Sequence, residues 1–382
     1  MLLVVTLVGM AAALLVYGMV DTSSIALRRD KITAAALAQA KQALIGRAFA
    51  DSNRPGSLPC PDLVTNIPGT NVPNDGSADL YAGDDCPSYI GRLPWRTLGL
   101  PDLRDGSGER LWYAVTREFA RNPSNAACLN SFCPLNTDNK GQFTITGTAA
   151  ATDVIAIVFS AGSVVAPQVR DTANENNVVN YLEGGNETGI TTLTFTADNV
   201  NDRLLAITGA DIWPLIEKRA ASEILAKLQA YRTAGANWCA CYPWADLSDG
   251  VTNEWRYYGR VPLLGAATAS TPEWVDLGIV IPSWLKDNNW PWVFFYTVSD
   301  SQSANHGPGT LTVDGVPGTS VVLITSGASI TGDNRPKGSP GSWNDGDWVY
   351  YVDDPENSDL GVVFTTPTPH IPAYAQDRLY KL

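Results

Sequence analysis

The feature that most constrains this 382-residue chain is its opening, because residues 1–20, MLLVVTLVGMAAALLVYGMV, contain no charged side chain. About 20 apolar residues in a helix match the thickness of the hydrocarbon core of a bilayer. A cleavable secretory signal needs a basic start and a small-x-small cleavage site. The chain shows neither feature, because it begins on Met1-Leu2-Leu3 and because Gly18-Met19-Val20-Asp21 is a poor cleavage site. Two interpretations remain, an ordinary membrane anchor and the first half of a longer helix.

The sequence after the apolar segment favours the longer helix. Residues 24–50 contain no Pro and one Gly, and they are rich in strong helix formers. The helix must end near residues 53–56, Asn-Arg-Pro-Gly, because Pro cannot continue it. We therefore predict one helix from residue 1 to about 52, which is ~78 Å long at 1.5 Å per residue. Its second half has an apolar face at steps of three and four residues, made of Ile25, Ile32, Ala36, Ala40, Ala43, Leu44 and Ala48.

A membrane anchor does not need this amphipathic continuation, whereas a filament subunit does, because its apolar half packs in a fibre core and its other half holds a head. In this respect the chain resembles the type IV pilin and type II secretion pseudopilin superfamily over about its first 50 residues. The resemblance implies that a prepilin peptidase removes a short basic leader and that Met1 begins the mature chain. It also implies an assembly segment that packs against neighbouring copies: Met1, Leu2, Leu3, Val4, Val5, Thr6, Leu7, Gly9, Leu14 and Leu15.

The chain departs from that superfamily at one position. Most members carry a Glu near the start that pairs with the N-terminal amine of a neighbour. Here Val5 and Thr6 occupy this region, and no carboxylate precedes Asp21. In the family the absence of this Glu is typical of minor subunits at the filament tip, and the size of the head, residues 54–382, also favours such a role. A major repeating subunit stays open as well.

Beyond the first helix the chain presents the same landmarks twice, which indicates an internal duplication. The first series contains LPCPDL (58–63), GRLPW (91–95), LWYAV (111–115), DVIAIVFSAG (153–162), NYLE (180–183) and NDRL (201–204). The second contains a helix over 212–234, then CYPWADL (241–247), GRVPL (259–263), WPWVFF (290–295), SVVLITSGA (320–328), VYYVD (349–353) and QDRL (376–379). Asp211 is expected to cap the second helix, with Pro214 in its first turn.

The predicted fold is therefore α+β, a long N-terminal pilin-type helix followed by two similar helix-plus-antiparallel-sheet lobes. The predicted parts are a filament-core half of the helix (1–23), an amphipathic half (24–53), a first lobe (54–210) and a second lobe (211–382). Strands are predicted where β-branched and aromatic residues gather, at 143–146, 154–159, 193–195 and 321–325.

The chain has an even number of cysteines, which favours disulfides in an exported head. Cys60 and Cys86 would close the acidic loop between them, and residues 128 and 133 would clip a shorter loop. A bridge between residues 239 and 241 spans one residue and is strained, so bonds from either to another cysteine stay open. Zinc is disfavoured, because no His lies nearby and the spacing is not C-x₂-C. The six positions are Cys60, Cys86, Cys128, Cys133, Cys239 and Cys241.

Two acidic loops offer the hard oxygen ligands that Ca²⁺ takes in sets of six to eight. Neither fits the EF-hand pattern, and solvated Asx turns are the alternative. The resemblance raises the expectation of calcium, because related pseudopilins and minor pilins sometimes hold it in head loops. The candidate ligands are Asp75, Asp79, Asp84, Asp85, Asp102 and Asp105. No other cofactor is expected.

The sequence does not indicate an enzyme. It lacks the G-x-S-x-G, H-E-x-x-H and P-loop motifs, and its two His, His306 and His370, stand in Gly/Pro-rich segments. A paired-carboxylate glycosidase is the enzymatic alternative. Seven of the 12 Trp fall between 238 and 292, so a carbohydrate-binding surface is an alternative to core packing. Its candidates are Trp238, Trp244, Trp274, Trp284, Trp290 and Trp292.

The net charge of −13 lies entirely beyond residue 20, and an acidic head disfavours nucleic-acid binding. The leading hypothesis is a structural subunit of a type IV pilus-like or pseudopilus-like filament. The resemblance implies as partners copies of itself or other pilin-like subunits, inner-membrane assembly machinery and prepilin peptidase. It implies the inner membrane and then the cell surface as locations. The alternatives are a tip-located minor pilin or adhesin and a membrane-anchored carbohydrate-binding protein.

Overall fold

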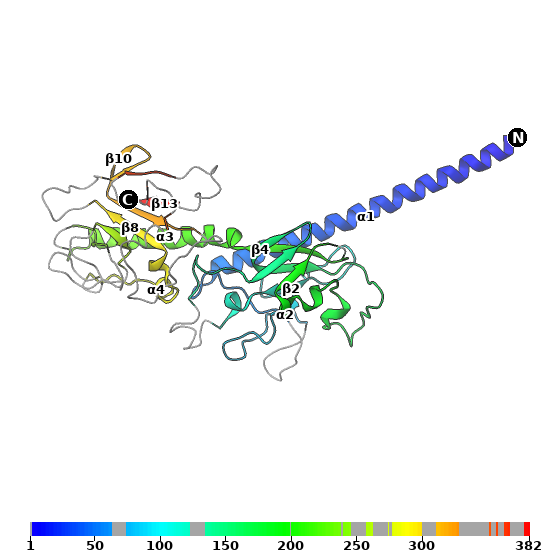
Figure 1. Ribbon diagram of the computed structural model, residues 1–382, viewed down its shortest axis with the longest axis horizontal. Coiled ribbons are helices and arrows are strands. Elements are labelled where there is room, and N and C mark those ends of the chain that lie inside the picture. The colour runs from blue at the N-terminus through cyan, green and yellow to red at the C-terminus, as the bar shows by residue number, and fades with distance from the viewer. Residues whose placement is uncertain are drawn as a thin grey trace. The chain divides into compact units, whose positions relative to one another are not determined.

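The computed structural model describes residues 2–62, 74–122, 134–198, 200–237, 240–245, 257–262, 274, 277–299, 311–327, 351–352, 357, 363–366 and 378–382, with side chains from Ser24 onward. The protein is mixed α+β, with an N-terminal helix and several sheets (Figure 1), which confirms the predicted class. The chain forms two compact units. Unit 1 comprises residues 1–47, 58–120 and 141–207, and unit 2 comprises residues 48–57, 121–140 and 208–382.

The N-terminal helix α1 spans Leu2–Ala50, close to its predicted end. From Thr33 onward it presents a buried face that includes Ala36, Ala40, Leu44 and Ala48, as the periodicity predicts. Ile25 and Ile32 belong to the same predicted apolar face, and both side chains are exposed. Among the described side chains of the helix, burial begins at Thr33.

Unit 1 contains a sheet in the order β1-β2-β4-β3-β5, with β6 also paired to β4. Its neighbours β1–β2, β2–β4 and β3–β4 are antiparallel, and β3–β5 is parallel. Its strands are β1 (Ile90–Arg92), β2 (Trp112–Val115), β3 (Phe143–Thr146), β4 (Ala151–Ser160), β5 (Thr194–Thr196) and β6 (Arg203–Thr208). Its short helices are η1 (Arg117–Ala120), η3 (Val178–Asn180), η4 (Asn186–Thr188) and α2 (Gly189–Thr192).

The central strands of this sheet are buried along their whole width. All four residues of β2 are buried, as are the last seven of β4, from Val154 to Ser160. Successive side chains of a strand point to opposite faces, so both faces are covered. This explains why β4 reads as a continuous apolar run. One face packs a core that includes Trp112, Phe159 and Phe195.

Unit 2 contains a four-stranded sheet in the order β13-β11-β8-β7, with all neighbours antiparallel, and a three-stranded sheet in the order β10-β9-β12. The strands are β7 (Tyr258–Arg260), β8 (Phe294–Val298), β9 (Leu311–Val313), β10 (Val316–Thr319), β11 (Val321–Thr325), β12 (Val363–Phe364) and β13 (Arg378–Lys381). The helices are α3 (Gly209–Thr233), α4 (Ser283–Asp287) and η5 (Trp290–Trp292).

The long helix α3 of unit 2 begins earlier than predicted. Its N-cap is Thr208, whose N–H donates to the Asp211 carboxylate at 2.8 Å, so Asp211 is the third helical residue and not the cap. Pro214 consequently lies inside the helix. In this capping box the side chain of each of the two residues, Thr208 and Asp211, accepts from the backbone N–H of the other. Two backbone donors are satisfied in this way, which favours Thr208 over Asp211 as the N-cap. The buried Glu217 of this helix pairs with Arg378 of β13.

Candidate functional site

The described side chains of the predicted assembly helix divide into an exposed section and a packed section. All side chains from Ser24 to Ile32 are exposed, and burial begins at Thr33. The exposed section carries large apolar side chains, with Ile25, Leu27 and Ile32 exposed by 48%, 70% and 44%. The assembly residues predicted within 1–23, from Met1 to Leu15, lie outside the side chains that the structure describes. Of the helices it does describe, none is long and apolar enough to cross a membrane.

The exposed section has an ordered pattern of charge and apolarity. Ile25, Arg28, Arg29 and Ile32 stand at i, i+3, i+4 and i+7, so they share one face of the helix. The α1 helix has five Lys/Arg against two Asp, while the rest of the chain has 21 Lys/Arg against 37 Asp/Glu. A cationic helix with exposed aliphatic side chains therefore belongs to a protein whose other residues are strongly anionic.

Three contacts within unit 1 hold the helix against its sheet where the exposed section ends. Gly106 donates its N–H to the Thr33 hydroxyl at 2.9 Å. Lys41 donates to the Ala206 carbonyl at 2.9 Å, and Arg203 pairs with Asp30 at 2.7 Å. A Cβ at Gly106 would lie 2.3 Å from the Arg29 carbonyl oxygen, so only Gly permits this approach.

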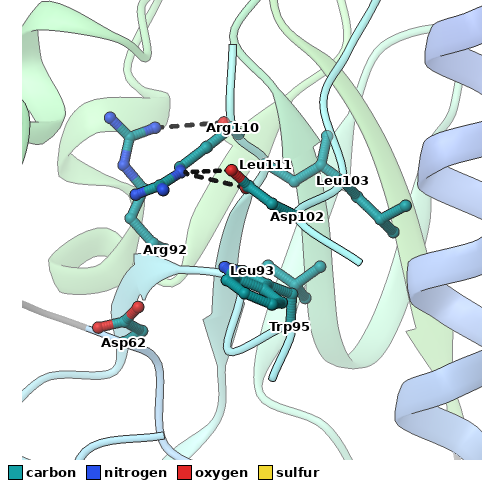
Figure 2. Close-up of a pocket in the computed structure, with 8 residues that line it drawn as sticks. All are labelled: Asp62, Arg92, Leu93, Trp95, Asp102, Leu103, Arg110 and Leu111. Carbon is teal, nitrogen blue, oxygen red and sulfur yellow. Dashed lines mark hydrogen bonds and ion pairs between the residues drawn. The ribbon is translucent and has the colours of Figure 1, made fainter. Parts of the chain in front are cut away.

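Unit 1 contains a narrow pocket lined by charged and apolar side chains, with no room for a water molecule, shown in Figure 2. Backbone hydrogen bonds of 2.9 Å in both directions join Asp62 to Arg92 at its edge. Arg92 is the last residue of β1, Leu93 follows it, and Leu111 directly precedes β2. The ends of these two strands therefore position part of the lining. The lining residues are Asp62, Arg92, Leu93, Trp95, Asp102, Leu103, Arg110 and Leu111.

The Arg92 guanidinium is buried between two aromatic rings, 4.3 Å from the centre of Trp112 and 4.1 Å from that of Tyr181. It donates to the carbonyls of Arg110 and Glu175, at 3.2 and 2.6 Å. Burial lowers its pKa from the ordinary value. Its planar donors thus tie strand ends to a distant loop, which a Lys could not do with the same geometry.

The Asp62 carboxyl lies at the edge of this pocket with a raised pKa. One oxygen accepts from the Gly76 N–H at 2.7 Å, and the other is buried without a hydrogen-bond partner. Burial, together with the nearby charges of Asp75 and Asp79, raises the pKa of Asp62 to about 7, although the hydrogen bond from the Gly76 N–H opposes the shift. Figure 2 shows Asp62 unconnected to the arginine side chains of the pocket.

The remaining two charged side chains of the pocket, Asp102 and Arg110, pair with each other. Asp102 pairs with Arg104 at 2.7 Å and with Arg110 at 3.1 Å, as the dashed lines to Arg110 in Figure 2 show. Because Asp102 and Arg110 are paired and the space has no room for a water molecule, the pocket offers no open cleft for a substrate. Its geometry serves the packing of strand ends.

The predicted calcium ligands do not converge in the structure. Asp75 pairs with Arg96, Asp85 pairs with Arg117, and Asp102 pairs as described above. Asp105 is buried and accepts from Ser107, Glu109, Ser160 and Gly162 with its two oxygens, which shapes the loop that reaches α1. In the described residues no group of three or more His, Cys, Asp or Glu is placed to hold a metal. The remaining two candidates, Asp79 and Asp84, therefore belong to no such group.

The structure contains the disulfide predicted between Cys60 and Cys86. It joins the residue two before Asp62 to a loop 26 residues later. Cys241 is also disulfide-bonded. The other three cysteines, Cys128, Cys133 and Cys239, lie outside the described residues.

Most of the predicted aromatic surface is core. Trp244, Trp274, Trp284 and Trp290 are buried, so they form no exposed platform for a sugar. Trp290 lies 6.3 Å edge-on from Trp284, and the Trp274 indole donates to the Pro262 carbonyl at 2.7 Å. Trp292 is half-buried beneath the Arg260 guanidinium at 4.1 Å, and Trp238 lies outside the described residues. These rings fill the interior because they bury large apolar areas.

Sequence reasoning missed the buried Asn186, which stands in the glycosylation sequon Asn186-Glu187-Thr188. Its amide donates to the Thr196 carbonyl at 3.1 Å and accepts from the Thr196 N–H at 2.8 Å. It also donates to Asp202 at 3.0 Å. A fully committed, buried amide is not an acceptor for a sugar. The repeated landmarks around it were the only sequence signal of a structural role.

Comparison with known proteins finds no relative for this chain. No protein-family model matches it, and neither the curated proteins nor the solved structures contain a match. The chain's own residues therefore carry the functional inference.

Proposed function

We propose that the protein is a non-enzymatic structural subunit of an extracellular filament of the type IV pilus or pseudopilus kind, assembled through its N-terminal helix. The observation that carries the proposal is the division of α1. Its sequence begins with 20 uncharged residues, its next section leaves Ile25, Leu27 and Ile32 exposed, and among its described side chains burial begins at Thr33. Apolar helical surface without an intramolecular partner favours contact with other copies or with lipid.

Such a helix supports assembly of a fibre by a heterologous interface, in which one surface of a copy meets a different surface of the next. The subunit would wait in the inner membrane after cleavage by prepilin peptidase and then join copies of itself or other pilin-like subunits. The acidic remainder of the chain would form the outer wall and keep fibres apart by repulsion.

A tip-located minor subunit is the second candidate, favoured by the absence of a carboxylate before Asp21. The carbohydrate-binding alternative loses support, because four of its six candidate Trp are buried. A structural calcium ion likewise has little support, since Asp75, Asp85 and Asp102 already pair with arginines.

We also propose that the head arose by internal duplication. In unit 1 the order β1-β2-β4-β6 occurs, and in unit 2 the order β7-β8-β11-β13 occurs in the same chain sequence. A parallel pair accompanies each, β3 with β5 and β9 with β12. Independent folding of unrelated segments would rarely produce the same order of pairing.

Matching side-chain contacts support the same proposal. The Tyr113 hydroxyl donates to the Pro59 carbonyl at 3.2 Å, and the Tyr296 hydroxyl donates to the Pro243 carbonyl at 2.9 Å. Each Tyr also pairs with the Gly of a Gly-Arg strand end: Tyr113 lies opposite Gly91 of β1, and Tyr296 lies opposite Gly259 of β7. These are contacts that packing of generic strands does not require.

The amide clamp is repeated as well. Asn186 bonds both backbone groups of Thr196, and Asn357 bonds both backbone groups of Thr365, at 2.9 Å each. Both Asn are fully buried. The clamped threonine stands at the end of the second strand of a parallel pair, since Thr196 is the last residue of β5 and Thr365 directly follows β12.

The helices align with a constant offset of 184 residues, the same offset that separates Pro59 from Pro243. Under it the buried residues Ala36, Leu37, Ala40 and Leu44 of α1 correspond to Ala220, Ala221, Ile224 and Leu228 of α3, which are also buried. In this proposal α3 is a shortened copy of α1 that lacks the assembly half.

Electron microscopy of sheared surface material tests the filament proposal. We expect regular fibres that contain this chain, and loss of fibres when residues 1–23 are deleted. The deletion should leave the Cys60–Cys86 disulfide and the far-ultraviolet circular dichroism of the head intact. Confinement of the chain to fibre ends would replace the major subunit by the tip subunit, and retention in the membrane without any fibre would refute both.

A further inference from the structure

Unit 1 carries a surface groove among its described residues. The groove has a volume of about 230 Å³, and its lining includes Val165, Pro167, Val179 and the buried Leu182. Pockets for whole small molecules measure about 300–1,000 Å³. This groove is smaller, so its size suits one or two protruding aliphatic side chains.

The walls of the groove are held in place by one buried guanidinium. Arg170, whose side chain is 3% exposed, donates to the Asn180 carbonyl at 2.8 Å and to the Gly162 carbonyl at 2.7 Å. The Val169 N–H donates to the Asn180 side chain at 2.9 Å, which joins the two walls. A groove fixed in this way needs little reordering when it is occupied.

The groove combines exposed aliphatic surface with negative charge. Val179 is 59% exposed at its rim, and the neighbouring Val164 and Val169 are more than half exposed. Glu183 and Glu187 also line the groove. Its occupant should therefore offer aliphatic side chains beside basic ones.

We infer that the groove binds the exposed section of α1, residues 24–32, from a second copy of this chain. That section supplies Ile25 and Ile32 on the same helical face as Arg28 and Arg29, with Leu27 beside them. Its aliphatic side chains match the valine walls and its guanidinium groups match the two glutamates. The contact joins two different surfaces of the same chain, so it propagates from copy to copy. The inference rests on the proposed filament function and names the surface on which its helix docks.

Paired cysteines in the full-length chain test the contact. A chain with Leu27→Cys and a differently tagged chain with Val179→Cys are expressed together in membranes and oxidised. We expect a reducible dimer that carries both tags. The matched control replaces Val179→Cys by Val316→Cys, because Val316 on β10 is also 59% exposed. Equal dimer yield with the control, or no mixed dimer, would overturn the inference.

Charge variants test the complementarity. Val179→Lys places a like charge against Arg28 and Arg29, and we expect the association of copies, measured by sedimentation in detergent, to weaken about tenfold or more. Val316→Lys should leave it unchanged. Arg29→Glu combined with Val179→Lys should restore association, because the introduced carboxylate then attracts the introduced ammonium group. Failure of that restoration while each single variant folds would contradict the proposed pairing.

The same samples distinguish this contact from the filament itself. Fibres without the mixed dimer would remove the docking surface and leave the filament function in place. The mixed dimer without fibres would retain the contact and remove the filament. If Arg29→Glu abolishes binding to vesicles with anionic lipid but leaves dimer yield unchanged, residues 24–32 serve the membrane surface and the inference is wrong.

Discussion

Asn186 and Asn357 show how single buried amides hold this head together. Each is fully buried and satisfies both backbone groups of a threonine next to a strand end. A buried polar group stabilises only while its partners are present, and leaving one unsatisfied costs about 1–3 kcal/mol. Arg92 works in the same way for the Arg110 and Glu175 carbonyls. Sequence reasoning could not assign these roles, because Asn and Arg are ordinarily surface residues.

Replacement of either amide by its isosteric acid should destabilise the head. Asn186→Asp removes the donor to the Thr196 carbonyl and places a charge beside Asp202. We expect the free energy of unfolding to fall by about 2–4 kcal/mol, measured by urea denaturation. Asn357→Asp should cause a loss of similar size, whereas the exposed Asn177→Asp should cause almost none. A large loss in only one of the two buried variants would argue against equivalent roles.

At the scale of secondary-structure elements, α1 has two sections with separate tasks. The section from Thr33 onward contributes to the core of unit 1, and residues 24–32 remain on the surface. The apolar periodicity runs through both sections, so sequence alone predicted one continuous apolar face and not which part of it is buried. The position at which the sheet begins to cover the helix decides which of its apolar residues are buried.

Two leucines of α1 should separate stability from assembly. Leu44 is fully buried, so Leu44→Ala should lower the free energy of unfolding by about 2–5 kcal/mol by creating a cavity. Leu27 is exposed, so Leu27→Ala should change it by less than about 0.5 kcal/mol while weakening the association of copies. Thermal unfolding and sedimentation measure the two effects. Equal destabilisation by both variants would contradict the division of the helix.

The loop that docks on α1 depends on a glycine. Gly106→Ala would force a Cβ against the Arg29 carbonyl and displace the hydrogen bond to Thr33, and we expect a loss of about 1–3 kcal/mol. Gly46→Ala, on the same helix with open space around it, should instead raise stability by about 0.5–1 kcal/mol through helix propensity. Chemical denaturation of both variants measures the contrast, and a neutral Gly106→Ala would show that the loop approach carries no energy.

At the scale of the whole molecule, the head is acidic and encloses two carboxyls that resist ionisation. Burial raises the pKa of Asp62 and of Asp202 to about 7. Each has one oxygen without a hydrogen-bond partner. Folding therefore favours the protonated form of both groups, and the stability of the protein depends on pH through them.

This linkage has a definite sign. Between the ordinary pKa of 3.8 and about 7, the folded protein retains protons that the unfolded chain releases. Stability is thus fully present at low pH and falls as pH rises through this window, by the order of 1–3 kcal/mol per carboxyl. Melting temperatures between pH 5 and 8 measure the slope. Asp62→Asn and Asp202→Asn should each flatten it, while the exposed Asp171→Asn should not.

The sequence by itself determined the α+β class, the helix through residue 50 and strands such as 143–146 and 321–325. These depend on runs of neighbouring residues whose propensity and periodicity are local. The pairing of Cys60 with Cys86 was among the candidate disulfides, and the structure contains it. The repeated landmarks that led to the duplication proposal were also visible in the sequence.

Tertiary structure alone decided which side chains became buried. It placed Trp244, Trp274, Trp284 and Trp290 in the core, engaged Asp75, Asp85 and Asp102 with arginines, and left Ile25 and Ile32 on the surface. It also moved the cap of α3 from Asp211 to Thr208. Burial and charge pairing depend on segments that are distant in the chain and meet only in the fold. A pattern within one segment therefore shows which face is apolar, whereas the fold decides what covers it.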